Sequence, residues 1–212
     1  MESKMEKTFF QKIQILLIKG MAKVHWQQTS RLSDEHKQEL KEKLTKDYYI
    51  IATRRDNQLT TFFICLGNYL LTRKWGRYTH VLVNLEDEVK SLTDFRLIEA
   101  TGKGVHFSTF EEVFEPTYDI ILIVPNNMTL KQWTVALDKA KTYLGRPYDN
   151  LFDLKSDLEI NCVELIRLAL LDTADYETNF AEFEKLVKSK KKLTPDMFAQ
   201  CADFKVVYRI KR

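Results

Sequence analysis

Five short apolar segments constrain the fold of this chain most. Each is rich in β-branched, aliphatic and aromatic residues and most end at charged, Asn, Pro or Gly residues, a pattern typical of strands. The segments are Tyr48–Arg54, Tyr78–Asn84, Phe95–Ala100, Tyr118–Val124 and Phe204–Ile210. Helical patterns lie between and after them, so the strands form one central group with helices around it. The sequence therefore predicts an α+β fold.

The helical patterns predict which side chains face the core. Leu59–Trp75 is expected to be a helix, and Thr129 is expected to cap a second helix that runs to Leu144. Shorter helices are expected over Ser108–Phe114 and from Thr194. The inward residues expected in the first helix are Phe62, Phe63, Leu66, Tyr69 and Leu70, with Cys65 as a core residue among them.

Composition narrows the class of protein. The chain has 212 residues, 44% of them hydrophobic, and a net charge of +3, which is too small to indicate nucleic-acid binding. Its three cysteines are widely separated, which argues against a disulfide framework or a zinc site and favours a reducing compartment. The apolar run Ile13–Ile18 is too short to cross a bilayer and precedes no cleavage site. We expect no metal, no cofactor, no transmembrane segment and a cytoplasmic or virion location.

The first part of the chain differs from the rest. Residues 1–47 are charged and helical in pattern, with a capping sequence that begins at Ser33. One buried face is expected in this region, formed by Phe9, Phe10, Ile13, Leu16 and Leu17. Residues 48–212 contain all the strand patterns. We therefore expect an N-terminal helical extension over 1–47 and one catalytic or binding domain over 48–212.

Cys162 is the candidate nucleophile. It follows a polar, turn-prone stretch and opens the apolar helical pattern that begins at Asn161, with Glu164 and Arg167 expected on the wetter side. A thiol in the first turn meets unpaired N–H groups and the positive end of the helix dipole, which favour the thiolate. The alternative is that Cys162 is a small buried apolar residue, as most free cysteines are.

A cysteine hydrolase also needs a base and a group that orients it. His80 begins an otherwise apolar strand, and Glu99 is a carboxylate inside another, where a buried acid needs a partner. These two are the preferred base and orienting residue. The alternatives are a strand-end histidine bonded to backbone and a Glu that points to water. His106, beyond the Gly102–Gly104 turn, competes with both for their roles.

Six motifs in order resemble a known family. They are Ile50–Arg54, Tyr78–Val83, Leu97–Ala100 with Gly104 and Val105, Gly145–Asp149, Asn161–Leu165 and Leu193–Asp196. Together they resemble the circularly permuted NlpC-type papain-like cysteine hydrolases, the YiiX/YaeF-like branch above all. In that family the histidine strand precedes the cysteine helix, as His80 and Glu99 precede Cys162 here. The resemblance implies a permuted papain-like fold, with an antiparallel sheet packed against helices and the cysteine at a helix N-terminus.

The resemblance also implies an activity. Cys162, His80 and Glu99 would cleave an amide bond through an acyl-enzyme, and Tyr148 and Asn161 would contact the substrate. The implied substrates are a peptidoglycan stem peptide, in a bacterial or phage setting, or an N-acylated amino acid or lipid. Acyl transfer stays open beside hydrolysis. Val163 stands where the family commonly has Ser, and export signals common in the family are not seen. A silent module that docks onto a larger assembly, such as a virion, through the N-terminal helices is the alternative.

Overall fold

The computed structural model describes residues 12–13, 16, 32–54, 59–72, 75–85, 96–117, 119–150, 158–190 and 193–210. At its centre is one six-stranded sheet in the order β4-β3-β2-β1-β5-β6, in which every neighbouring pair is antiparallel. The strands are β1 (Ile50–Arg54), β2 (His80–Leu85), β3 (Arg96–Thr101), β4 (Gly104–Thr109), β5 (Asp119–Pro125) and β6 (Phe204–Ile210). An α+β fold with an antiparallel sheet is confirmed.

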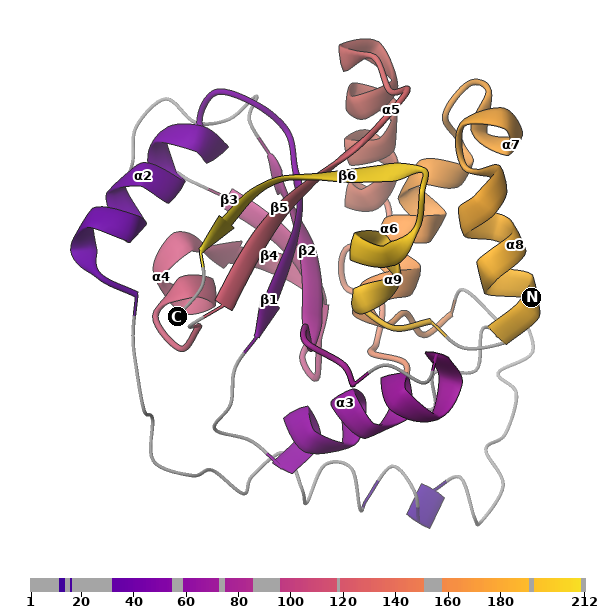
Figure 1. Cartoon of the computed structure of the whole chain (residues 1–212), viewed down its shortest axis with the longest axis horizontal. Helices are drawn as coiled ribbons and strands as arrows, with labels where there is room; N and C mark the ends of the chain where they lie inside the picture. Colours follow the sequence, from indigo (N-terminus) through magenta and orange to yellow (C-terminus); the bar gives the residue numbers. More distant parts are fainter. Residues whose placement is uncertain are drawn as a thin grey trace.

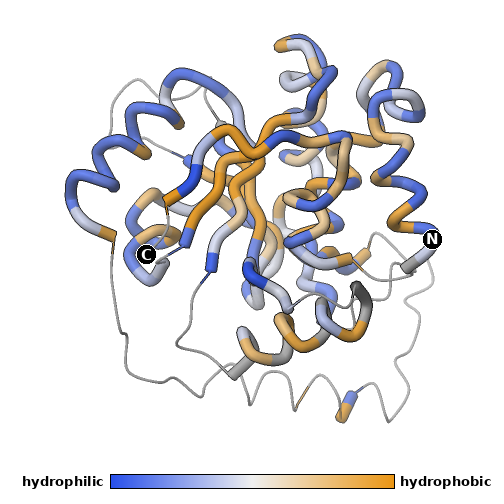
Figure 2. The backbone as a smooth tube through the Cα atoms, viewed as in Figure 1, coloured by the Kyte–Doolittle hydropathy of each residue, from blue (hydrophilic) through white to orange (hydrophobic). Residues whose placement is uncertain are grey.

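Two layers of helices cover the sheet (Figure 1). The larger core lies against α5 (Leu130–Lys141), α6 (Cys162–Leu171), α8 (Ala181–Lys190) and α9 (Asp196–Gln200). The smaller core lies against α2 (Asp34–Leu44) and α4 (Phe110–Phe114). Because β1 alternates, Ile50 and Ala52 enter the larger core and Ile51 the smaller one. Figure 2 shows the resulting apolar strands between helices whose outer faces are hydrophilic. The described residues also include α3 (Leu59–Thr72) and α7 (Tyr176–Asn179).

Helix α2, in the N-terminal region, packs into the smaller core. Ser33 caps α2 by accepting from the His36 N–H, and Leu40 and Leu44 are fully buried. Asn84 of β2 connects this region to the sheet, because its amide accepts from the Tyr49 N–H and donates to the carbonyls of Leu44, at the end of α2, and Asp47. The capping predicted at Ser33 is confirmed. The buried face expected at Phe9, Phe10, Ile13, Leu16 and Leu17 is wrong where the structure describes it, because Ile13 is 38% and Leu16 72% exposed. Phe9, Phe10 and Leu17 lie outside the described residues, and the boundary at residue 47 stays a prediction.

Three expectations about local structure are wrong. The short helix expected over Ser108–Phe114 begins only at Phe110, because Ser108 and Thr109 belong to strand β4, which pairs with β3 along its whole length. Glu164 is buried instead of facing water, because it takes part in the cap of α6. In α3, Phe62, Tyr69 and Leu70 are exposed rather than inward, with Phe62 at 48% and Leu70 at 63%. Helical periodicity identifies an apolar helix but cannot choose the side that packs when apolar residues surround it.

The other α3 residues divide in the same way. Cys65 is buried as expected, and Leu66 is partly buried. Phe63 lies outside the described side chains. Of the helices in the described ranges, none is long and apolar enough to span a bilayer.

Candidate active site

The cysteine helix begins with a complete cap. Asn161 has extended backbone geometry, and its side-chain oxygen accepts from the N–H groups of Val163 and Glu164, each at 3.0 Å. Glu164 reaches back and accepts from the Asn161 N–H at 2.9 Å and from its amide at 2.6 Å. This reciprocal pattern is a capping box with Asn in place of Ser or Thr. Cys162 is thereby held as the first residue of α6, as the sequence predicts.

His80 lies between the cysteine and a buried carboxylate. Its Nε2 atom is 2.5 Å from Oε2 of Glu99, and its side chain also hydrogen-bonds with Cys162. Burial by itself lowers the pKa of His80, but the hydrogen bonds and charges of Cys162 and Glu99 outweigh burial and raise that pKa to about 9. The imidazole therefore carries its proton at neutral pH, between two groups that favour the charged ring.

The backbone pairing of β2 and β3 ends next to this contact. The pairing runs from Leu85–Arg96 to Val83–Ile98 and stops there, before His80 and Glu99 are reached. Beyond that point the His80–Glu99 hydrogen bond links the two strands. Because α6 packs on both strands, its first residue, Cys162, lies within hydrogen-bonding reach of the histidine that begins β2.

Glu99 is the central acceptor of the site. It is 4% exposed, and its second oxygen, Oε1, accepts a hydrogen bond from the Ser108 hydroxyl. His106 lies directly opposite Glu99 in the β3–β4 pairing, and its Nε2 is 3.6 Å from the same oxygen. The Nδ1 atom of His106 donates to the Gly104 carbonyl at 2.9 Å. His106 therefore lies behind the carboxylate, while His80 is the imidazole that contacts Cys162.

Tyr148 is a second hydrogen-bond partner of the Cys162 side chain. Its hydroxyl hydrogen-bonds with the Cys162 side chain, and burial, followed by the charges of Cys162 and Asp149, raises the pKa of Tyr148 well above its usual value. The phenol is therefore neutral and can donate to a thiolate. The structure brings Tyr148 to the nucleophile, and its contact with substrate stays a prediction.

The loop that carries Tyr148 is attached to β4. The Val105 N–H donates to the Arg146 carbonyl at 2.8 Å, and the Gly145 N–H donates to the Val105 carbonyl at 2.9 Å. Gly104 has a φ of +95°, and a Cβ there would lie 2.5 Å from the Arg146 oxygen. Only glycine allows this approach without displacement. The spacing of Tyr148 from the cysteine thus depends on a glycine in a different hairpin.

A buried acid holds the segment that leads into His80. The carboxylate of Asp196, in α9, accepts from the Arg77 N–H at 2.9 and 3.1 Å and from the Tyr78 N–H at 3.2 Å. Arg77 in turn donates to Asp119 at 2.7 Å. These bonds fix the start of β2 to the C-terminal part of the chain. The Leu193–Asp196 motif is therefore structurally connected to the histidine strand.

Four of the five site residues predicted from the sequence are linked by hydrogen bonds, and the fifth, Asn161, caps the cysteine helix. His80 hydrogen-bonds with Cys162 and Glu99, and Tyr148 hydrogen-bonds with Cys162. Both ends of the Asn161 amide are engaged within the cap, so the contact of Asn161 with substrate stays a prediction. Sequence reasoning missed Ser108, which carries no motif. Its only sequence signal is that it falls two residues from His106, and alternation then places both side chains on one face.

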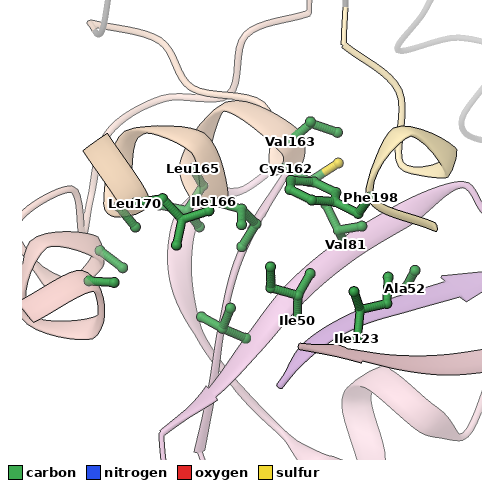
Figure 3. Close-up of a cluster of buried hydrophobic side chains, with 14 of the residues drawn as sticks. Ile50, Ala52, Val81, Ile123, Cys162, Val163, Leu165, Ile166, Leu170 and Phe198 are labelled. Atoms are coloured by element: carbon green, nitrogen blue, oxygen red, sulfur yellow. The ribbon is translucent and has the colours of Figure 1, made fainter. Parts of the chain in front are cut away.

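The environment of the sulfur limits what can reach it. Cys162 is 3% exposed and lies at the edge of the larger core; Figure 3 shows it with Val81 and Phe198 among the buried side chains. In the described ranges no group of three or more His, Cys, Asp and Glu side chains is arranged to hold a metal ion.

A solved structure shares this fold. The crystal structure of the metalloprotein yiiX from Escherichia coli O157:H7 (DUF1105) matches with a TM-score of 0.55 and 16% identity, over 78% of this chain and 98% of that one. No protein-family model matches the sequence, and no curated protein is significantly similar to it. The structural similarity is to YiiX, one of the two proteins after which the family branch suggested by the sequence is named. At 16% identity, this similarity is evidence for the fold alone.

Proposed function

We propose that this protein is a papain-like thiol hydrolase that cleaves an amide bond with Cys162 as nucleophile, His80 as acid and base, and Glu99 as the orienting carboxylate. The observation that carries the proposal is the position of His80, whose ring contacts the sulfur of Cys162 and, at 2.5 Å, Glu99. A histidine so placed can hold a thiolate as an ion pair and keep its own proton available. A core cysteine would need neither partner.

The reaction would proceed in two steps, acylation of Cys162 and hydrolysis of the resulting thioester. The Cys162 thiolate attacks the carbonyl carbon and forms a C–S bond, and the C–N bond then breaks as His80 gives its proton to the leaving amine. Water next attacks the thioester, with His80 taking a proton from it. The C–S bond breaks, a carboxylic acid leaves, and the thiolate and imidazolium are restored.

The cap of α6 supports an oxyanion site at the same position. Asn161 caps the N–H groups of Val163 and Glu164, and its side chain does not take the N–H of Cys162. A backbone N–H in the first turn of a helix suits charge that develops on the attacked oxygen. We assign this role to the Cys162 N–H, with the Tyr148 hydroxyl as a donor beside it.

For the substrate, we propose the two classes that the family resemblance implies. One is a stem peptide of peptidoglycan, in a bacterial or phage setting. The other is an N-acylated amino acid or lipid, for which acyl transfer to an amine or alcohol would replace the water step. Both classes present an acyl carbonyl to the same thiolate.

The test uses a small thiol reagent and mass spectrometry on the full chain. Because the site is nearly closed, iodoacetamide is a better probe than a bulky reagent. We expect alkylation at Cys162 that falls sharply in His80→Gln, while Cys65→Ser and Cys201→Ser serve as controls that leave it unchanged. Incubation with bacterial sacculi and, separately, with acylated amino acids then identifies the substrate from the released product. Equal labelling of Cys162 in the wild type and in His80→Gln would contradict the proposal.

A second candidate function has its own observations. Cys162 is nearly buried, and Val163 follows it. In addition, α3 presents exposed Phe62 and Leu70 at the surface. These features suit a module that keeps the fold, has a silent site and docks onto a larger assembly. An intact fold with a Cys162 inert to iodoacetamide over the whole pH range supports this second function.

A further inference from the structure

The carboxylate of Glu99 has a second, unassigned partner that is independent of His80. The β3–β4 pairing sets Leu97 opposite Ser108 and Glu99 opposite His106. Ser108 is therefore the diagonal neighbour of Glu99 on the same face of the hairpin, within reach of its side chain. Both residues are buried, and the Ser108 hydroxyl donates to Oε1 of Glu99.

We propose that Ser108 is a positioning residue of the catalytic site, which holds Glu99 ionised and in one orientation so that the proton between Glu99 and His80 stays on His80. This inference rests on the proposed function. It adds a fourth side chain, from β4, to the three that the reaction uses directly.

Two physical consequences of the Ser108 bond lead to this role. With one oxygen bonded to His80 and the other to Ser108, the carboxylate cannot rotate, so the imidazole is held at a fixed angle toward Cys162. A hydroxyl that donates also stabilises the ionised carboxylate relative to the acid. At an N···O distance of 2.5 Å, that preference decides which partner carries the shared proton.

The other charged and titratable groups around the site are few in the described part of the chain. His106 faces the Glu99 oxygen that Ser108 occupies, at 3.6 Å, and donates its Nδ1 proton to the Gly104 carbonyl. On the other side, Tyr148 contacts Cys162, and Asp149 and Glu164 act on Tyr148 through their charges. Ser108 is a neutral donor to Glu99. Its removal therefore changes no net charge at the site and acts on His80 through the carboxylate that both residues contact.

The test is an NMR titration of the histidine ring signals in the full chain, which needs no substrate. The chain has four histidines, and His80→Gln assigns the His80 signal by its loss. In the wild type we expect a midpoint near 9. Ser108→Ala and Ser108→Cys should each lower it by about one pH unit, because a strong donor to a charged group is lost. Ser108→Thr, which keeps the hydroxyl, should leave the His80 midpoint near its wild-type value.

Matched controls separate this role from simple stabilisation. Thr117→Val removes another buried hydroxyl, which donates to the Val113 carbonyl at 2.8 Å at the end of α4, and should leave the His80 midpoint unchanged. A wild-type midpoint near 6.5 would overturn the ion pair and with it the proposed function. A wild-type midpoint near 9 that Ser108→Ala and Ser108→Cys leave in place would overturn the present inference alone. A midpoint that Ser108→Thr lowers equally would also overturn it, by assigning the effect to packing.

Discussion

Gly104→Ala should disturb the candidate site from a residue that touches none of its reactive atoms. Gly104 has a φ of +95°, and an added Cβ would meet the Arg146 carbonyl oxygen at 2.5 Å. That oxygen accepts the Val105 N–H and precedes Tyr148 by two residues. The methyl group must therefore push the Tyr148 loop away from β4.

The magnitude follows from two separate costs. A residue with a side chain at positive φ loses about 1–2 kcal/mol. Displacement of the Arg146 carbonyl breaks its bond to the Val105 N–H and leaves a strand group poorly paired, for about 1–3 kcal/mol more. We expect Gly104→Ala to lower the free energy of unfolding by about 2–5 kcal/mol in total.

Two other glycines of the same region are matched controls. Gly145 has a φ of +80° but open space around its Cβ position, so Gly145→Ala should show the conformational cost alone, about 1–2 kcal/mol. Gly102 has open space and no positive φ in this range, so Gly102→Ala should be close to neutral. Urea denaturation measures all three, and iodoacetamide labelling of Cys162 reports the site. Equal effects of Gly104→Ala and Gly145→Ala would refute the steric reasoning.

Three further predictions concern the core and the ion pair. Cys162→Ala should abolish labelling and, at about pH 10, where the ion pair no longer contributes, change the free energy of unfolding by no more than about 1 kcal/mol. A loss of several kcal/mol in urea at that pH would mark a purely structural residue. Because the pKa of His80 is raised to about 9 from 6.5, its contribution to stability is complete below pH 6.5 and is lost as pH rises through 9. Urea titrations should show that fall, on the order of 3 kcal/mol, and His80→Gln should remove it. Asn84→Ala leaves three backbone groups without their partner and should cost about 2–3 kcal/mol in urea, with Cys162 labelling preserved.

The elements that sequence reasoning predicts well are those in which local pattern and tertiary environment agree. The closing strand was expected at Phe204–Ile210 and is found there, and Cys162 opens its helix as the preceding polar stretch indicates. Strand β4 was missed because its residues, with His106 and Ser108 in the middle, do not form an apolar run. Polar residues within an edge strand interrupt the apolar pattern by which strands are recognised in a sequence.

The amino-acid sequence alone determined the α+β class, the order of most elements and the residue types of a thiol site, because these depend on periodicity, capping and the chemistry of individual side chains. Tertiary structure decided which side chains meet. The packing of α6 on β2 and β3 brings Cys162 to His80, and the β3–β4 register adds Ser108 to Glu99. Tertiary packing also left the Phe62 side of α3 outside the core. Strand register, the packing of a helix on a sheet and the packed side of an apolar helix arise from contacts between residues far apart in the chain, and no local pattern contains them.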